Sequence, residues 1–207
     1  RVGETPQKIM RVLIITGDKS FKSGHPRFDM QASQVGLTAA YWGRGMLWPR
    51  IPAGKFDVVT VQDPFWRGTI GWYLARRMGA KLNVQVHTDL SAQSFVRHIL
   101  AQVVLRHTDS VRVVSQKIKE QVLRMSIKTP VYVLPIYVDI DRFRNIMRQP
   151  HDKKTILWLG RFESEKDPVY AISILKKVRA QGIDAKLVML GKGSMEQRLR
   201  ERARELP

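Results

Sequence analysis

The sequence predicts an α/β protein with a largely parallel sheet, followed by a second and smaller unit of the same kind. Short apolar segments rich in β-branched residues alternate with segments of helical spacing along the chain. A polar stretch at Arg148–Lys154, which contains Pro150, interrupts this alternation before a new strand starts at Thr155. We therefore expect two domains, residues 1–148 and residues 149–207.

The first domain is predicted to contain six strands and three clear helices. The expected strands are Ile9–Thr16, Gly36–Tyr41, Asp57–Gln62, Leu82–His87, Val111–Val114 and Val131–Leu134. The expected helices are Gly68–Met78, Ser91–His107 and Gln116–Arg124. In Ser91–His107, Ser91 is the expected cap, and Phe95, Ile99, Val103 and Arg106 recur at helical spacing. The connection between Gly17 and Asp57 has room for one helix besides the strand Gly36–Tyr41.

The second domain reads as half of a doubly wound unit. Its expected order is strand Thr155–Leu159, helix Pro168–Ala180, strand Ala185–Leu190 and helix Ser194–Arg204. Two strands alone leave a sheet edge without a neighbour, which is an unfavourable place to stop. We expect the native protein to continue beyond Pro207, or another element to cover that edge.

Composition indicates a globular protein. The 207 residues are 43% hydrophobic and 26% charged. The sequence contains no run of eighteen apolar residues, so we expect no membrane span. There are no cysteines and five histidines, so disulfides and thiolate metal sites are excluded and a metal site is disfavoured, although carboxylates alone could hold Mg²⁺. The chain starts at Arg1 without a signal-peptide profile, so we expect a trimmed, cytoplasmic protein.

The net charge of +18 points to an anionic partner. Residues 1–148 hold 23 Lys and Arg against 10 Asp and Glu, a net charge of +13, and residues 149–207 hold 13 against 8, a net charge of +5. Phosphate polymers, anionic lipid surfaces and phosphorylated small molecules all fit this charge, as does a merely solvated basic surface. The tryptophans follow no RNA-binding motif, so nucleic acid is the less favoured partner.

Two glycine turns carry the strongest chemical signal. The first predicted strand of the second domain runs into Gly160-Arg161, with Lys166 five residues after Arg161, and the second runs into Gly191 and Gly193. A glycine turn that opens a helix presents unpaired N–H groups to an anion. Arg161 adds a planar fork of donors and Lys166 a mobile point charge, which together suit a diphosphate. The alternative is an ordinary strand end with solvated cations.

Six segments in a fixed order resemble a family-4 glycosyltransferase of the GT-B architecture, which has two Rossmann-like domains. The segments are residues 57–65, 83–90, 109–115, 133–143, 156–167 and 188–194, spread over most of the chain. The resemblance implies a retaining transferase that takes a sugar from a nucleotide-diphosphate donor held between the domains. It implies a glycan or lipid acceptor, and no obligatory metal or other cofactor.

The resemblance also assigns residues. In the family, the cations matching Arg161 and Lys166 bind the donor diphosphate, the glycines matching Gly191 and Gly193 lie near the nucleotide, and the histidine matching His87 faces the sugar. Gly160 begins the diphosphate turn. Gly17 stands where the family has paired glycines beside the donor phosphate.

Three further residues in the loop after Gly17 are candidates for contacts to an anionic acceptor, although a solvated loop is an equal alternative. They are Lys22, His25 and Arg27.

One motif of the family is not matched. The family has a Glu-x7-Glu motif that grips the donor, and no Glu pair at that spacing follows Lys166. The activity of this chain by itself is therefore an open expectation. The alternative function is a non-catalytic basic module for a membrane surface or RNA. A transferase could itself dock on anionic lipid at the cytoplasmic membrane face through its basic first domain, and Arg97, His98 and Arg106 of the helix Ser91–His107 are a candidate docking face. A helix packed on the sheet with a charged outer side explains the same residues.

Overall fold

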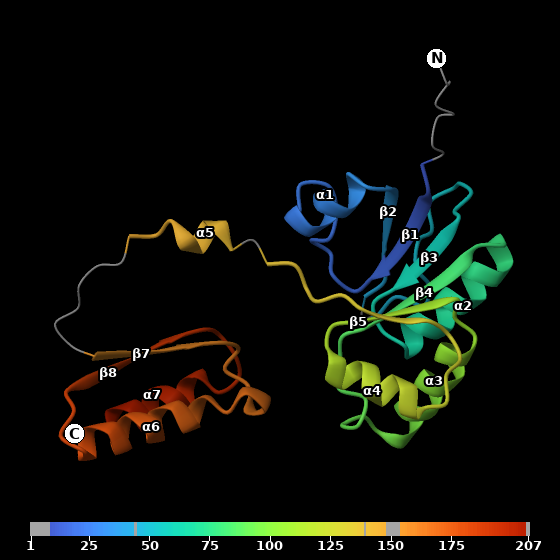
Figure 1. Ribbon diagram of the computed structural model, residues 1–207. Coiled ribbons are helices and arrows are strands. Elements are labelled where there is room, and N and C mark those ends of the chain that lie inside the picture. Colours follow the sequence, from blue (N-terminus) through green and yellow to red (C-terminus); the bar gives the residue numbers. More distant parts are fainter. Residues whose placement is uncertain (1–8, 44, 139, 148–153, 206–207) are drawn as a thin grey trace. The chain divides into compact units, whose positions relative to one another are not determined.

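The computed structural model describes residues 9–43, 45–138, 140–147 and 154–205. The chain divides into two units, unit 1 from Arg1 to Val138 and unit 2 from Asp139 to Pro207. The predicted domain boundary between residues 148 and 149 lies outside the described residues. Each unit has its own sheet (Figure 1).

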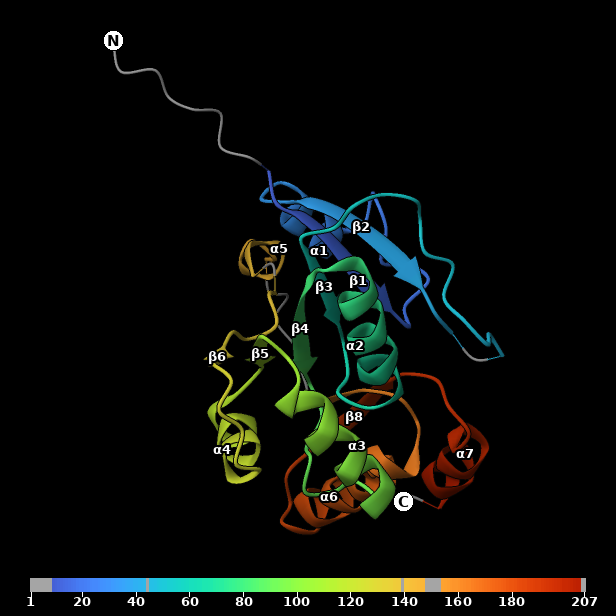
Figure 2. The ribbon, with the colours of Figure 1, turned by 90° about the vertical axis from the view of Figure 1, so that its right-hand side faces the viewer.

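Unit 1 is built on a six-stranded parallel sheet with the strand order β2-β1-β3-β4-β5-β6 (Figure 2). The strands are β1 Arg11–Thr16, β2 Gly36–Tyr41, β3 Val58–Val61, β4 Lys81–Val86, β5 Ser110–Val113 and β6 Val131–Val133. Neighbouring strands pair in parallel register, for example Ile14 with Thr60. The strand order reverses direction beside β1, and in such sheets ligands bind at the carboxyl ends of the strands.

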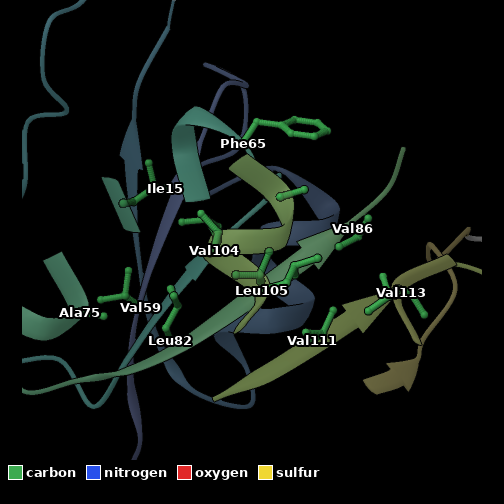
Figure 3. Close-up of a cluster of buried hydrophobic side chains, with 14 of the residues drawn as sticks. Ile15, Val59, Phe65, Ala75, Leu82, Val86, Val104, Leu105, Val111 and Val113 are labelled. Atoms are coloured by element: carbon green, nitrogen blue, oxygen red, sulfur yellow. The ribbon is translucent and has the colours of Figure 1, made fainter. Parts of the chain in front are cut away.

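The helices of unit 1 are α1 Pro26–Ala32, α2 Trp66–Met78, α3 Phe95–Arg106 and α4 Gln116–Arg124. Figure 3 shows the core, in which strand residues such as Ile15, Val59 and Val111 meet Val104 and Leu105 of α3. These five side chains are at most 1% exposed. The parallel sheet with alternating helices confirms the predicted α/β class. Strands that are apolar on both faces need helices to cover both faces.

One expectation for unit 1 is wrong. Ser91 does not cap α3; the N-cap is Ser94, and the Ser91 hydroxyl donates to Asp89 Oδ1 at 2.6 Å in a turn before the helix. The apolar residues that recur at helical spacing in α3, Phe95, Ile99 and Val103, face outward. Phe95 is 78% exposed, whereas Ala101, Val104 and Leu105 are buried. The helix is apolar on two sides, so periodicity alone could not choose the inner one.

The loop after β1 contains α1, the one helix for which this connection had room. His25 is its N-cap, Pro26 begins it, and the His25 ring Nδ1 accepts a hydrogen bond from the Arg27 backbone N–H at 3.2 Å. A capping side chain followed by proline is a favourable helix start. His25 is thus part of the fold rather than a free loop residue.

Unit 2 has the predicted order strand, helix, strand, helix. Strand β7 Lys154–Leu159 pairs in parallel with β8 Ala185–Leu190, and the helices are α5 Asp141–Arg144, α6 Pro168–Ala180 and α7 Glu196–Arg204, with a 3-10 turn at Ser164–Lys166. Its small core centres on Phe162, Ile172 and Leu199. The opposite face of the two strands is exposed, as Leu159 and Leu190 show at 63% and 66%.

Candidate functional site

Unit 1 has a cavity of about 560 Å³ at the carboxyl ends of its strands. His87, which directly follows β4, lines it together with Gln62, Gln85, Arg112 and, from α1, Arg27. The cavity therefore has a polar wall that is drawn from several strands, at the edge of the sheet where parallel α/β proteins bind ligands.

His87 is half-buried in this wall. Burial lowers the pKa of His87, and the positive charges of Arg112 and Arg27 lower it further. A lowered pKa keeps the imidazole neutral at pH 7, so the ring acts as a hydrogen-bonding group and not as a fixed cation. The structure thus places His87 in a cavity, as a sugar contact would require.

Arg112 is held in place rather than free to bind an anion. Its Nη1 donates to Gln85 Oε1 at 2.8 Å, its Nε to the Leu134 carbonyl at 3.0 Å and its Nη2 to the Pro135 carbonyl at 3.0 Å. Neither Gln85 nor Arg112 was expected from the sequence. The signal was present, because Asn83, Gln85 and His87 alternate with apolar residues along a strand of a sheet that helices cover.

Three residues that were predicted in the loop after β1 lie in different surroundings in the structure. They are Gly17, Lys22 and Arg27. A Cβ on Gly17 would lie 2.2 Å from Arg67 Nη2, so this glycine makes room for the guanidinium of Arg67. Arg67 is itself held by Asp63 Oδ2 at 2.7 Å. Of the loop candidates, Arg27 lines the cavity, whereas the described lining includes neither Lys22 nor Gly17. The phosphate contact of Gly17 stays a prediction.

In unit 2, the turns that follow β7 and β8 are joined by their backbones. The Gly160 N–H donates to the Leu190 carbonyl at 3.1 Å, and the Phe162 N–H donates to the Lys192 carbonyl at 2.9 Å. Such close pairing leaves no room for a side chain at Gly191 or Gly193. A Cβ on Gly191 would lie 1.9 Å from the Gly160 carbonyl oxygen, and one on Gly193 would lie 2.4 Å from that of Phe162.

The structure therefore brings Gly160, Gly191 and Gly193 together in one pair of turns. This pair, residues 160–163 and 191–194, is called the glycine turn pair below. Glu163 closes it, because its carboxylate accepts from the Ser194 N–H at 3.0 Å and from the Ser194 hydroxyl at 2.7 Å. These hydrogen bonds lower the pKa of Glu163.

The two predicted cations extend from the first turn. Arg161 is exposed and pairs with Glu165. Lys166 is exposed at the end of the 3-10 turn, and no ion pair joins it to another described residue. One expectation is wrong: the Gly160 turn does not open a helix directly, since the 3-10 turn and Asp167, with φ 42°, precede α6. The helix is delayed because α6 starts at Pro168, whose fixed φ suits a first helical position.

Within residues 9–43, 45–138, 140–147 and 154–205, no three His, Asp or Glu side chains gather in a way that could hold a metal ion. None of the helices described for this chain combines the length and the apolar character needed to cross a bilayer.

Two family models match the chain. The family model described as Glycosyltransferase Family 4 matches residues 18–142, and the model described as Glycosyl transferases group 1 matches residues 139–207. A search of the curated proteins finds no match.

Solved structures show the same fold. HepE of Anabaena, crystallised with UDP and glucose, is 11% identical with a TM-score of 0.66, and the match covers 94% of this chain and 65% of that one. Sucrose-phosphate synthase of Thermosynechococcus elongatus is 16% identical with a TM-score of 0.60, and the match covers 94% of this chain and 66% of that one. The chain thus spans a little under two thirds of either length. At these identities the likeness shows the fold alone, which is that of the GT-B class. The first family model covers more than half of the 207 residues, and the chain belongs to Glycosyltransferase Family 4.

Proposed function

We propose that this protein is a retaining glycosyltransferase that moves a sugar from a nucleotide-diphosphate donor to a glycan or lipid acceptor. The family membership supports the reaction class. The observation that carries the donor assignment is the glycine turn pair with exposed Arg161 and Lys166 beside it. That HepE was crystallised with UDP and glucose makes a uridine nucleotide the first donor to test.

The cations of unit 2 suit the charge that develops during transfer. In the proposed step, the bond between the sugar C1 and the diphosphate oxygen breaks and its electron pair stays on the phosphate. The acceptor oxygen bonds to C1 from the same face, and its proton passes to the departing phosphate. Arg161 and Lys166 stabilise the growing negative charge electrostatically. We propose that these two cations fill this role without a metal ion.

In the same proposal, His87 hydrogen-bonds a sugar hydroxyl. The neutral ring and the polar cavity wall support this role. Uncharged hydrogen-bond donors and acceptors can bind a sugar hydroxyl and do not select for a charged ligand. Gly17, Gly160, Gly191 and Gly193 are proposed to let the backbone approach the nucleotide.

The donor assignment is tested by thermal unfolding with UDP, GDP and ADP. A ligand at about a hundred times its Kd stabilises a protein by about 2.7 kcal/mol, which is readily measured. We expect one nucleoside diphosphate to stabilise the chain, and Lys166→Ala to weaken that effect by about tenfold in Kd. Lys176→Ala on α6 is the charge-matched control and should bind like the unmodified chain.

A short RNA, added at the same phosphate concentration as the nucleotides and at two salt concentrations, distinguishes donor binding from the alternative function, a basic module that binds RNA. Counterion release makes RNA binding fall steeply with salt. Stabilisation by RNA alone, salt-sensitive and indifferent to Lys166→Ala, would refute donor binding by this chain and favour the basic module.

A second proposal, peripheral association with an anionic membrane at its cytoplasmic face, rests on the outer face of α3. Phe95, Val96, Ile99 and Val103 are 78%, 60%, 43% and 41% exposed. Arg106, in the last turn of the same helix, adds a cation to this face. Exposed apolar side chains with a cation beside them suit the boundary of an anionic bilayer.

Vesicle sedimentation tests the membrane proposal. The chain should pellet with vesicles that contain phosphatidylglycerol and remain in solution with phosphatidylcholine alone. The double variant Phe95→Ser, Val96→Ser should lose most of this binding. Leu123→Ser on α4 is the control, because Leu123 is also 49% exposed but lies on another helix. Equal loss in both variants would contradict a role for α3.

A further inference from the structure

Gln85 occupies an unusual position in the wall of the unit 1 cavity. Its side chain is 7% exposed, and both ends of its amide are bonded. Nε2 donates to Thr60 Oγ1 at 3.0 Å, while Oε1 lies 2.8 Å from Arg112 Nη1 and 3.3 Å from His87 Nε2. One buried oxygen therefore faces two nitrogen atoms, one from the next strand and one from the candidate sugar-binding residue.

Arg112 determines which end of the amide points toward His87. A guanidinium only donates hydrogen bonds, so the amide atom in front of Nη1 has to be the oxygen. The other hydrogen bonds of this group are consistent with that orientation of the amide. Thr60 Oγ1 receives the Gln85 hydrogen and donates to Asn83 Oδ1 at 2.9 Å, and Asn83 Nδ2 donates to Ser110 Oγ at 2.8 Å. Reversing the Gln85 amide would set two donors against each other at Arg112.

This orientation decides the tautomer of His87. Because the oxygen of Gln85 accepts, the hydrogen of a neutral imidazole has to sit on Nε2. Nδ1 then keeps its lone pair. No other described residue hydrogen-bonds to the ring, so Nδ1 is available to the cavity that His87 lines. Burial of the ring, followed by the nearby charges of Arg112 and Arg27, lowers the pKa of His87, which preserves that lone pair near pH 7.

We infer that Gln85 and Arg112 are positioning residues that hold His87 with its hydrogen on Nε2 and its acceptor atom, Nδ1, toward the bound sugar. The inference rests on the proposed function in one respect only, namely that the occupant of the cavity is a sugar hydroxyl that donates to Nδ1. The tautomer itself is a property of the ligand-free protein. The sequence requirement is an amide oxygen at position 85 and an obligate donor at position 112.

The experiment is nuclear magnetic resonance of the full chain labelled with ¹⁵N-histidine. Two-bond correlations distinguish a protonated ring nitrogen from an unprotonated one, and His87→Asn identifies the His87 signals among the five histidines. We expect one tautomer with Nε2 protonated and its N–H proton slow to exchange. Gln85→Met should lose that slow proton, and Gln62→Met is the matched control, since Gln62 lines the same cavity but bonds to Thr16 instead.

A second variant keeps the inference falsifiable if Gln85→Met does not fold. Gln85→Glu retains an acceptor oxygen and adds a charge, and should raise the pKa of His87 by about one or more, because an adjacent carboxylate favours the imidazolium. Gln62→Glu should raise it less. Protonation on Nδ1 in the unmodified chain, or equal effects of the variants at positions 85 and 62, would overturn the inference.

Titration with UDP-glucose separates this inference from the proposed function. A shift of the His87 Nδ1 signal, with Nε2 unchanged, supports both. A ligand-free spectrum of the expected form with no response to UDP-glucose, GDP-glucose or ADP-glucose leaves the positioning intact and contradicts the sugar contact. A Nδ1–H tautomer contradicts the positioning whatever the ligand does.

Discussion

The two units hold their candidate site residues by different means. In unit 1, His87 is surrounded by side chains that fix one another, with Gln85 and Arg112 at the centre. In unit 2, the glycine turn pair is held by backbone hydrogen bonds, and Arg161 and Lys166 extend from it into solvent. The cavity of unit 1 should therefore be sensitive to a change of side-chain chemistry, and the turns of unit 2 to the addition of any side chain.

The largest effect is expected at Gly191. Its substitution by alanine places a methyl group 1.9 Å from a backbone oxygen that cannot move without breaking the turn pair. We expect unit 2 to lose about 3 kcal/mol of stability, the upper end for overpacking. Hydrogen exchange of β7 and β8 measures this loss separately from unit 1.

Gly182 is the control for that substitution. It has a φ of 78°, but no heavy atom lies within 4 Å of the position that a Cβ would take, so alanine there costs only backbone strain, about 1 kcal/mol. Similar losses for Gly191→Ala and Gly182→Ala would contradict the view that close backbone contact restricts unit 2.

An intermediate effect is expected at Asp89 in unit 1 and Glu163 in unit 2, two carboxylates that accept hydrogen bonds from loop residues. Hydrogen bonds from Lys117, Ser91 and Gln121 lower the pKa of Asp89, and those from Ser194 lower that of Glu163. A carboxyl with a lower pKa in the folded state stabilises it above the unfolded pKa, about 4, and loses that contribution as the pH falls through the folded value. Asp89→Asn should thus be less stable than the unmodified chain at pH 7, with the difference shrinking below about pH 4.

Denaturant unfolding at several pH values measures this difference. Asp89 has three donor residues, Lys117 and Gln121 on α4 and Ser91 in its own turn, whereas Glu163 has a single donor residue, so Glu163→Gln should show the same pH trend with a smaller amplitude. A difference for Asp89→Asn that persists unchanged at pH 3 would show that its charge is not the cause.

The smallest effect is expected at Glu165, which competes with a bound diphosphate for Arg161. Exposed ion pairs contribute about 0.2–1 kcal/mol, so Glu165→Gln should tighten binding of the nucleoside diphosphate by at most about fivefold. Calorimetric titration measures the change, and Glu201→Gln on α7 is the control. Weaker binding by Glu165→Gln would mean that Glu165 supports the site instead of competing for it.

Most of the fold could be predicted because each strand is a short apolar run and each long helix has a clear period. The strand Gly36–Tyr41 and the helices Gln116–Arg124 and Pro168–Ala180 have the predicted bounds. The inner face of α3 could not be predicted, since apolar residues line both of its sides. The start of that helix was misplaced because Asp89, outside the helix, takes the hydroxyl of Ser91.

The candidate site was only partly predictable. His87, Arg161, Lys166 and the glycines stand out as single residues in turns. The group around Gln85 does not, because its members come from three strands and are joined only when the sheet forms. A polar residue inside a strand is uninformative alone, and its partner is set by the register between strands.

The directed chain of hydrogen bonds through β3, β4 and β5 also limits how this sequence can change over generations. Each member gives its hydrogen to the next, from Arg112 through Gln85 and Thr60 to Asn83. Replacing Thr60 alone with an apolar residue, for example, leaves the amide hydrogen on Gln85 Nε2 buried without its acceptor, which costs about 1–3 kcal/mol, whereas replacing the set together need cost little. Homologues should therefore keep these positions as a block or exchange them as a block, with few intermediates.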